Sequence, residues 1–202
     1  MDSVATQRVS NPEIESLHSL LPHSSPEAQG VSSIGVWRFI EAVDQQVRFM
    51  HSFMILRHGH ILAQGYWPPH APDKPHVLWS LSKSFTSTAV GLCVSQGMLS
   101  LDDSVIGFFP EYVPTHPGSN LHAMCVRDLL TMTTGHDSEP SLTQSMPWEQ
   151  SFLAHPLPHT PGTHFLYNSA ASHMLSAIIQ KLTGETMLDF LRPRLFEPLG
   201  IT

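Results

Sequence analysis

The chain has 202 residues, and 41% of them are hydrophobic whereas only 13% are charged, which predicts a folded domain with a substantial core rather than a disordered chain. Its formal net charge is −7 and it has no basic run, which argues against binding to nucleic acids and to anionic membranes. We see no secretory signal, no apolar run of membrane-spanning length and no metal-ligand spacing of the two cysteines, so we expect a reduced, cytoplasmic setting without a cofactor.

Composition divides the chain into an arm and a domain. Residues 1–32 are rich in serine, proline and other polar residues, which predicts an N-terminal arm, whereas residues 33–202 predict part of a single domain. The domain opens with apolar residues at helical spacing over 34–47, and Ser32 or Ser33 is the expected N-cap.

A hairpin and a loop follow the first predicted helix. Two short apolar runs, at 53–56 and 61–63, flank "RHGH", which predicts two antiparallel strands with Gly59 in the turn. The next segment, "PPHAPDKPH" at 68–76, contains four prolines and is expected to be a loop.

Helical patterns dominate from residue 80 onward. The predicted helices cover 80–96, 126–134, 169–183 and 186–196, and they are closed respectively by Gly97, Gly135, Gly184 and Pro198. The helix over 80–96 is expected to bury a stripe formed by Leu81, Phe85, Thr88, Ala89, Leu92 and Cys93. Residues 136–163 are rich in proline and serine and predict a loop with only weak helical patches.

The stretch "WSLSKSF" contains a candidate nucleophile and base. A serine hydroxyl becomes a good nucleophile when a neighbouring base removes its proton. Lys83 follows Ser80 by three residues, which places both on one helical face with Cβ atoms ~5–6 Å apart. The unpaired N–H groups of the first turn, together with burial, favour a neutral lysine that can accept a proton. A serine at a helix start is also a common N-cap, so the spacing alone leaves both interpretations open.

The flanking sequence resembles one known family over about residues 50–202. "SLSKSFTSTAVGLCVSQGMLSLDDSV" combines Ser-x-x-Lys with a Gly-x-Leu-x-Leu-Asp-Asp-x-Val connection, and "VRDLLTMTTG" and "PGTHFLYNSAASHML" follow in order. These segments are similar to the serine β-lactamase and penicillin-binding-protein superfamily, in particular to class C β-lactamases and their esterase and D-aminopeptidase relatives. The resemblance implies an α+β fold of the β-lactamase/transpeptidase type, with a helical region and an antiparallel sheet flanked by helices.

The resemblance also implies a role for five residues. Ser80 takes the position of the nucleophile, Lys83 that of the base or proton relay, and Tyr167 that of a second proton-transfer group. Asn168 and Ser169 are the substrate-binding candidates, and Ser169 stands where the family often has asparagine. The implied reaction is hydrolysis of a small-molecule ester, amide or β-lactam through an acyl-enzyme, with an esterase or amidase favoured over a true β-lactamase. The oxyanion is expected to bind the backbone N–H of Ser80 and one N–H from a neighbouring strand.

The family's third motif, Lys-Thr-Gly or His-x-Gly, lies on a strand well after the "PLG" segment, and these 202 residues end at that segment. We therefore expect this chain to lack the C-terminal strands of the sheet and to be poorly active alone. The alternative hypothesis is a catalytically inactive fragment, or a non-enzymatic remnant or assembly module of the same fold.

The other polar clusters predict no metal site. His155, His159 and His164 are close in sequence among the 14 histidines, but intervening prolines exclude the helical spacing of a zinc motif. Asp102 and Asp103 are adjacent on a short connection, where neighbouring side chains point apart, so we expect them to cap a turn rather than act as a carboxylate pair.

Overall fold

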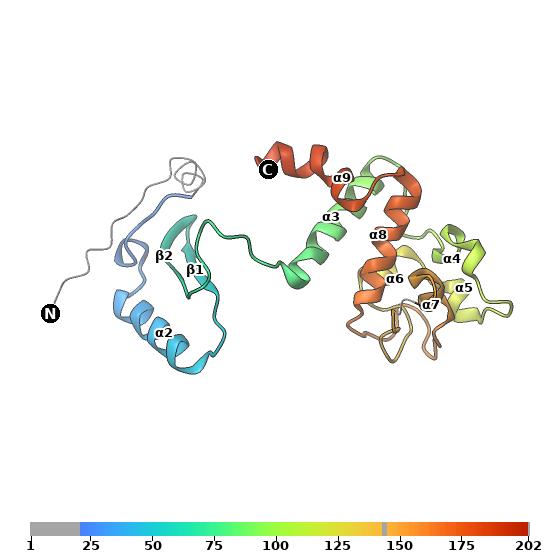
Figure 1. The fold of residues 1–202 in the computed structure, drawn as a ribbon, viewed down its shortest axis with the longest axis horizontal. Coiled ribbons are helices and arrows are strands. Elements are labelled where there is room, and N and C mark those ends of the chain that lie inside the picture. Colours follow the sequence, from blue (N-terminus) through green and yellow to red (C-terminus); the bar gives the residue numbers. More distant parts are fainter. Residues whose placement is uncertain (1–20, 143–144, 202) are drawn as a thin grey trace. The chain divides into compact units, whose positions relative to one another are not determined.

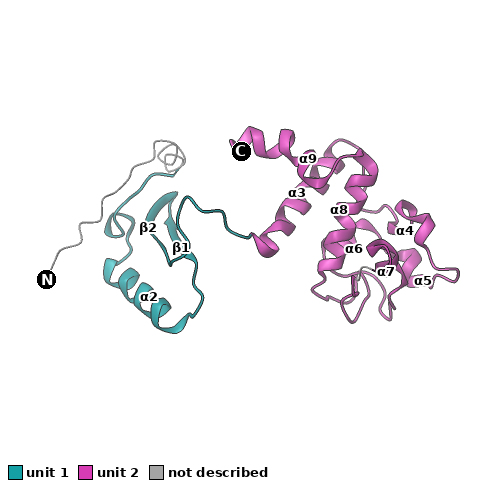
Figure 2. Cartoon of the chain, viewed as in Figure 1, with its two compact units in different colours: residues 1–77 teal, residues 78–202 magenta. Residues whose placement is uncertain are grey.

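The structure is a computed structural model of the chain, and it describes residues 21–142 and 145–201. Its elements belong to two compact units, residues 1–77 and residues 78–202 (Figure 1, Figure 2). The first unit contains η1 (Glu27–Gln29), α2 (Ser33–Gln46), β1 (Ser52–Arg57) and β2 (His60–Tyr66). The second contains η2 (Trp79–Leu81), α3 (Ser82–Ser95), α4 (Val105–Phe108), η3 (Pro110–Tyr112), α5 (Ser119–Ala123), α6 (Val126–Leu130), α7 (Trp148–Ala154), α8 (Ser169–Thr183), α9 (Met187–Leu191), η4 (Arg192–Phe196) and η5 (Glu197–Leu199). Among the described residues, no helix has the length and apolar content needed to cross a lipid bilayer.

The hairpin forms where the sequence predicted it. β1 and β2 pair in antiparallel register, with Arg57 opposite His60 beside the turn. The two turn residues, His58 and Gly59, have φ values of 49° and 76°. Positive φ at both positions is the geometry of a type I′ turn, which matches the twist of the two strands, and glycine adopts it without a steric penalty.

Two neighbouring segments pack on this hairpin within the first unit. Part of the predicted arm pairs with β2, since the Ile61 N–H donates to the Pro22 carbonyl at 2.8 Å and the Ile61 carbonyl accepts from the Ser24 N–H at 3.1 Å. The first 20 residues of that arm lie outside the described residues. Helix α2 begins as predicted, and its Phe39 packs edge-on against Phe53 of β1 with ring centroids 5.7 Å apart.

Helix α8 is the centre of the second unit (Figure 1). It packs against α3, α6, α7 and α9, and apolar residues at helical spacing form its buried face. These buried residues are Ala170, Ala171, Met174, Leu175, Ile178 and Ile179. The helix starts at Ser169 and ends at Gly184, whose φ of 73° stops the helical turn, so both predicted boundaries are confirmed.

The helix predicted over 80–96 begins two residues later than expected. Trp79–Leu81 form the 3₁₀ turn η2, and the α-helical part starts at Ser82. Most of the predicted apolar stripe is confirmed, since Ala89 and Cys93 are buried and Phe85 and Leu92 pack against the core. Leu81 and Thr88 are exposed instead, and Val90 is buried in addition. Gly97 follows the helix with a φ of 69°, as predicted.

The prediction that Gly135 ends the helix after residue 126 was wrong. Helix α6 ends at Leu130, and Met132 takes the left-handed conformation with a φ of 56°. Gly135 instead allows a close approach of two backbone segments, because a Cβ at this position would collide with the carbonyl oxygen of His159.

Helical structure also extends past Pro198, where the sequence predicted that it would stop. Helix α9 continues through the π-helical turn η4 into η5, and Gly200 ends the segment with a φ of 70°. Pro198 fits because it lies in the first turn of η5, where a missing N–H has no intrahelical partner to lose. Helices α4 and α5 were not predicted, since elements of four and five residues are too short to show helical periodicity.

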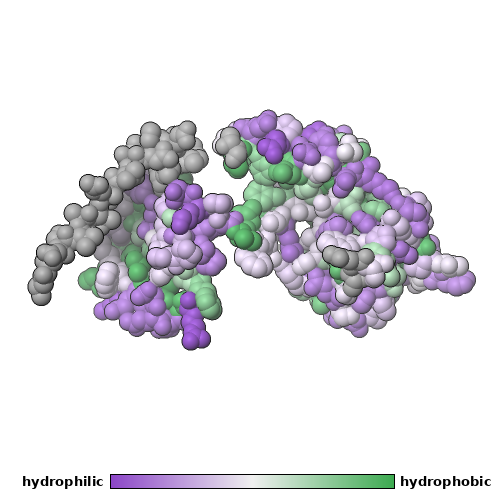
Figure 3. Space-filling view, in the orientation of Figure 1, coloured by the Kyte–Doolittle hydropathy of each residue, from purple (hydrophilic) through white to green (hydrophobic). Residues whose placement is uncertain are grey.

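The second unit has an exposed apolar groove. Its volume is about 510 Å³, and it lies between α3 and the segment formed by α9 and η4. Leu78, Phe85 and Phe196 are among its lining residues, and the neighbouring Trp79 is 78% exposed. Hydrophobic residues are visible on the surface over this part of the unit (Figure 3). Contiguous exposed apolar surface of this kind is typical of a contact surface.

Candidate active site

Ser80 lies in the 3₁₀ turn that leads into α3. The Leu81 N–H donates to the Leu78 carbonyl at 3.0 Å and closes this turn. The preceding residue, Trp79, has a φ of 48°. Residues other than glycine rarely adopt this backbone conformation, and the exceptions are concentrated at functional sites. The first N–H groups of such a helical segment have no intrahelical acceptor, so they are available to stabilise negative charge beside Ser80.

Lys83 contacts Ser80 as the sequence spacing predicted. The Lys83 Nζ donates to the Ser80 Oγ at 3.3 Å and to the Ser169 Oγ at 3.3 Å. The first contact follows from local geometry, because residues three apart share a helical face. The second joins the start of α3 to the start of α8, two helices that pack against each other.

Tyr167 reaches this cluster because two loop segments pair before α8. The Leu166 N–H donates to the Met132 carbonyl at 3.0 Å, and the Gly162 N–H donates to the Thr133 carbonyl at 2.8 Å. The close approach at Gly135 belongs to the same pairing. The "TMTTG" segment therefore supports the backbone that carries Tyr167.

The Tyr167 hydroxyl and the Ser80 Oγ are 2.6 Å apart, a short O–H···O hydrogen bond. Hydrogen bonds from Ser80 and Lys83, together with the positive charge of Lys83, hold the pKa of Tyr167 below its usual value of 10, although partial burial and the charge of Glu139 oppose this shift. The Lys83 Nζ also lies 5.0 Å from the centroid of the tyrosine ring. A tyrosine in this environment forms the phenolate, which is the form that can accept the Ser80 proton, more readily than an isolated phenol does.

The two residues after Tyr167 have different surroundings. Asn168 is fully buried, and its Oδ1 accepts the Ala171 N–H at 3.0 Å as the N-cap of α8. Ser169 is exposed, and its Oγ accepts a hydrogen bond from Lys83. The structure therefore brings together Ser80, Lys83, Tyr167 and Ser169, whereas the side chain of Asn168 anchors the helix. Its role as a substrate contact stays a prediction.

Glu139 is a member of the site that the sequence did not reveal. Its Oε1 accepts the Ser169 N–H at 2.6 Å, so a negative charge lies at the N-terminus of α8. The carboxylate also acts on the pKa of Tyr167, which it raises. Glu139 belongs to a proline- and serine-rich loop 30 residues from Ser169, and no local pattern indicates that the two meet.

The remaining sequence candidates are separate from this cluster. Asp102 forms an ion pair with Arg127 of α6 at 2.8 Å, whereas Asp103 accepts a hydrogen bond from the Ser100 N–H at 2.8 Å. The two carboxylates therefore have different partners. His159 and His164 stack with ring centroids 4.1 Å apart, whereas His155 bonds a serine hydroxyl at 3.0 Å.

The family of this chain follows from comparison with known proteins. Residues 38–202 match the family model described as Beta-lactamase. The chain belongs to the Beta-lactamase family. Both the resemblance predicted from the motifs and the predicted fold class are confirmed, since the described residues form helices and a small antiparallel sheet.

Three similar proteins illustrate the range of this family. The lovastatin esterase of Penicillium rubens is 28% identical over 170 residues, which cover 70% of this chain and 42% of the esterase. A D-stereospecific amidohydrolase from Streptomyces sp. is 24% identical with a TM-score of 0.57, covering 68% of this chain and 46% of that protein. The octameric penicillin-binding protein homologue from Pyrococcus abyssi is 24% identical with a TM-score of 0.62, and the match covers 84% of this chain and 43% of the homologue. The chain thus spans less than half of the length of each.

Proposed function

We propose that this chain supplies the nucleophile and the proton-transfer groups of a serine hydrolase that forms an acyl-enzyme on small ester or amide substrates. The observation that carries the proposal is the contact of Ser80 with both Tyr167, at 2.6 Å, and Lys83, at 3.3 Å. A capping serine needs neither contact, whereas a nucleophile needs a neighbouring group that removes its proton.

The proposed reaction begins when the Ser80 Oγ attacks the substrate carbonyl carbon. The hydroxyl proton passes to Tyr167, which the charge of Lys83 stabilises as a phenolate, and then to the departing alcohol or amine. Water attacks the resulting ester of Ser80 in the second half of the reaction, releases the acid and restores the hydroxyl. The Ser169 Oγ accepts a hydrogen bond from Lys83 and keeps the Lys83 Nζ beside the Ser80 hydroxyl during both steps.

The developing negative charge on the substrate oxygen requires hydrogen-bond donors. The backbone N–H of Ser80 is the donor proposed from this chain, because it belongs to the turn that opens α3. A second donor from a strand is what the family resemblance implies. Loss of one such donor lowers kcat by ~10²–10³ in a well-studied serine protease, so the second donor matters for the rate.

Esters and amides are favoured over β-lactams as substrates. The support comes from the named activities of similar proteins, an esterase and an amidohydrolase.

A fluorophosphonate probe tests the proposal, because it reacts covalently with activated serines. We expect one adduct per chain on the peptide that contains Ser80, detected by mass spectrometry, and its loss in Ser80→Ala. Ser82→Ala is the matched control, since Ser82 lies two residues later and its side chain contacts neither Lys83 nor Tyr167. Equal labelling of wild type and Ser80→Ala would overturn the proposal. Absence of an adduct in a longer version that carries the family's third motif would overturn it as well and favour a non-enzymatic role.

A further inference from the structure

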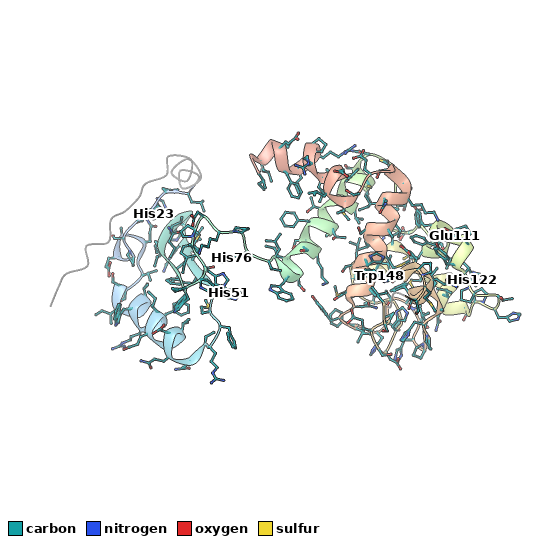
Figure 4. All side chains as sticks on the ribbon, viewed as in Figure 1. His23, His51, His76, Glu111, His122 and Trp148 are labelled. Carbon is teal, nitrogen blue, oxygen red and sulfur yellow. The ribbon has the colours of Figure 1, made fainter. Side chains whose placement is uncertain are left out.

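Three histidine side chains gather in the first unit, within residues 1–77. His51 immediately precedes β1, whereas His70 and His76 belong to the proline-rich loop that follows β2. One ring nitrogen of each histidine lies within 4.8 Å of those of the other two. Figure 4 labels His51 and His76, which lie close together at one end of the hairpin. Among the described residues, no other group of three or more potential metal ligands meets this distance.

Backbone hydrogen bonds bring His51 and His70 together without help from their rings. The Trp67 N–H donates to the His51 carbonyl at 2.9 Å, which extends the hairpin pairing by one residue beyond Ser52 and Tyr66. The His70 N–H then donates to the Trp67 carbonyl at 2.9 Å and turns the loop back toward His51. The meeting of the His51 and His70 rings therefore follows from the path of the chain.

The rings themselves have few favourable partners. His51 and His70 stack with centroids 3.9 Å apart, and His76 meets His70 edge-on at 4.6 Å. The Nε2 atom of His76 is buried and has no hydrogen-bond partner among the described residues. A buried polar atom without a partner costs free energy, so a group that binds this nitrogen would stabilise the loop.

All three members of the cluster offer imidazole nitrogens as ligands. Neutral imidazole is the form that binds metal ions, and three such nitrogens suit Zn²⁺, Cu²⁺ and Ni²⁺ far better than Mg²⁺ or Ca²⁺.

We propose that His51, His70 and His76 form a binding site for a divalent transition-metal ion, represented here by Zn²⁺. Zn–N bonds of ~2.0–2.1 Å at tetrahedral angles place the ligand nitrogens about 3.3 Å apart. The rings must therefore close by no more than about 1.5 Å from their present separation, which rotation of the side chains can supply. The exposed side of His51 gives solvent access, and water completes the fourth position.

The bound ion would restrain the proline-rich loop that follows β2. It would join His76, near the end of this loop, to His51, which immediately precedes β1. Because such a site rarely exists in an unfolded chain, the free energy of metal binding would stabilise this part of the fold. This site is independent of the proposed hydrolase chemistry.

The experiment is a calorimetric titration of the untagged 202-residue chain with Zn²⁺, after removal of metals by a chelator. We expect one Zn²⁺ per chain in the wild type, and a loss of affinity of at least ~100-fold in His70→Ala and in His76→Gln, since even indirect partners of a metal ligand contribute ~10–100-fold. His60→Ala is the matched control, because His60 lies on the same hairpin but bonds the His58 carbonyl and lies outside the cluster.

Two readouts separate a built site from surface binding to the other histidines. Co²⁺ should give visible absorption bands typical of tetrahedral coordination in the wild type and in His60→Ala, and weak or octahedral spectra in His70→Ala. Circular dichroism checks that each variant keeps its helical content. Equal Zn²⁺ affinity of all variants, or binding that His60→Ala weakens as much as His70→Ala does, would overturn the proposal.

Discussion

Replacing His136 with glutamine should make the folded chain less sensitive to acid. The ring of His136 is fully buried, its Nδ1 lies 2.8 Å from the Thr134 hydroxyl, and it packs edge-on against Phe152 at 4.9 Å. Burial, reinforced by His155 at a ring distance of 5.3 Å, lowers the pKa of His136 from 6.5 to about 4. The loop that His136 anchors also carries Glu139 to the start of α8.

The magnitude follows from the difference between the two pKa values. Between pH 6.5 and about 4, the unfolded chain binds a proton at His136 that the folded chain does not. The unfolded state therefore gains stability as the pH falls through this window, and the effect levels off below the folded pKa. A difference of about 2.5 pH units corresponds to about 3 kcal/mol at ~1.4 kcal/mol per unit, which is a large part of the ~5–15 kcal/mol that stabilises a typical domain.

Urea unfolding followed by tryptophan fluorescence at about pH 7, 5.5 and 4 measures this effect. The wild type should lose about 3 kcal/mol more free energy of unfolding than His136→Gln over this range, whatever the stability of each at pH 7. His122→Gln provides the control, since His122 is exposed and should leave the wild-type slope unchanged. Equal slopes for wild type and His136→Gln would refute the assignment of a buried neutral imidazole.

Two further predictions concern the site and its support. Lys83→Met should raise the pKa of Tyr167 toward 10, because it removes a hydrogen bond and a positive charge. The phenolate absorbance that is lost in Tyr167→Phe should then appear at higher pH, and an unchanged titration would contradict the proposed contact. Gly135→Ala should cost at least about 2 kcal/mol in urea unfolding, since its φ of 95° and the adjacent carbonyl exclude a Cβ. Gly107→Ala, which meets no atom within 4 Å, should leave stability equal or higher, and equal costs for the two would refute this reasoning.

Long periodic elements could be predicted from the sequence, and short or irregular ones could not. Helix α8 and the hairpin repeat their apolar residues over enough positions to determine their type and their glycine ends. The 3₁₀ start of α3 was missed because a single tight turn has no periodic signal. Gly135 was assigned to a helix end because a sequence cannot show which distant backbone approaches it.

The sequence by itself determined the family, through four motifs in order, and the contact of Ser80 with Lys83, because residues three apart on a helical turn are neighbours in any fold that keeps the turn. Only the tertiary structure decided that Tyr167, 87 residues away, lies 2.6 Å from Ser80, and that Glu139 lies at the start of α8. The meeting of His51, His70 and His76 beside the hairpin was likewise decided only by the tertiary structure. Such contacts depend on how helices and loops pack over long sequence separations, and local patterns contain no information about that packing.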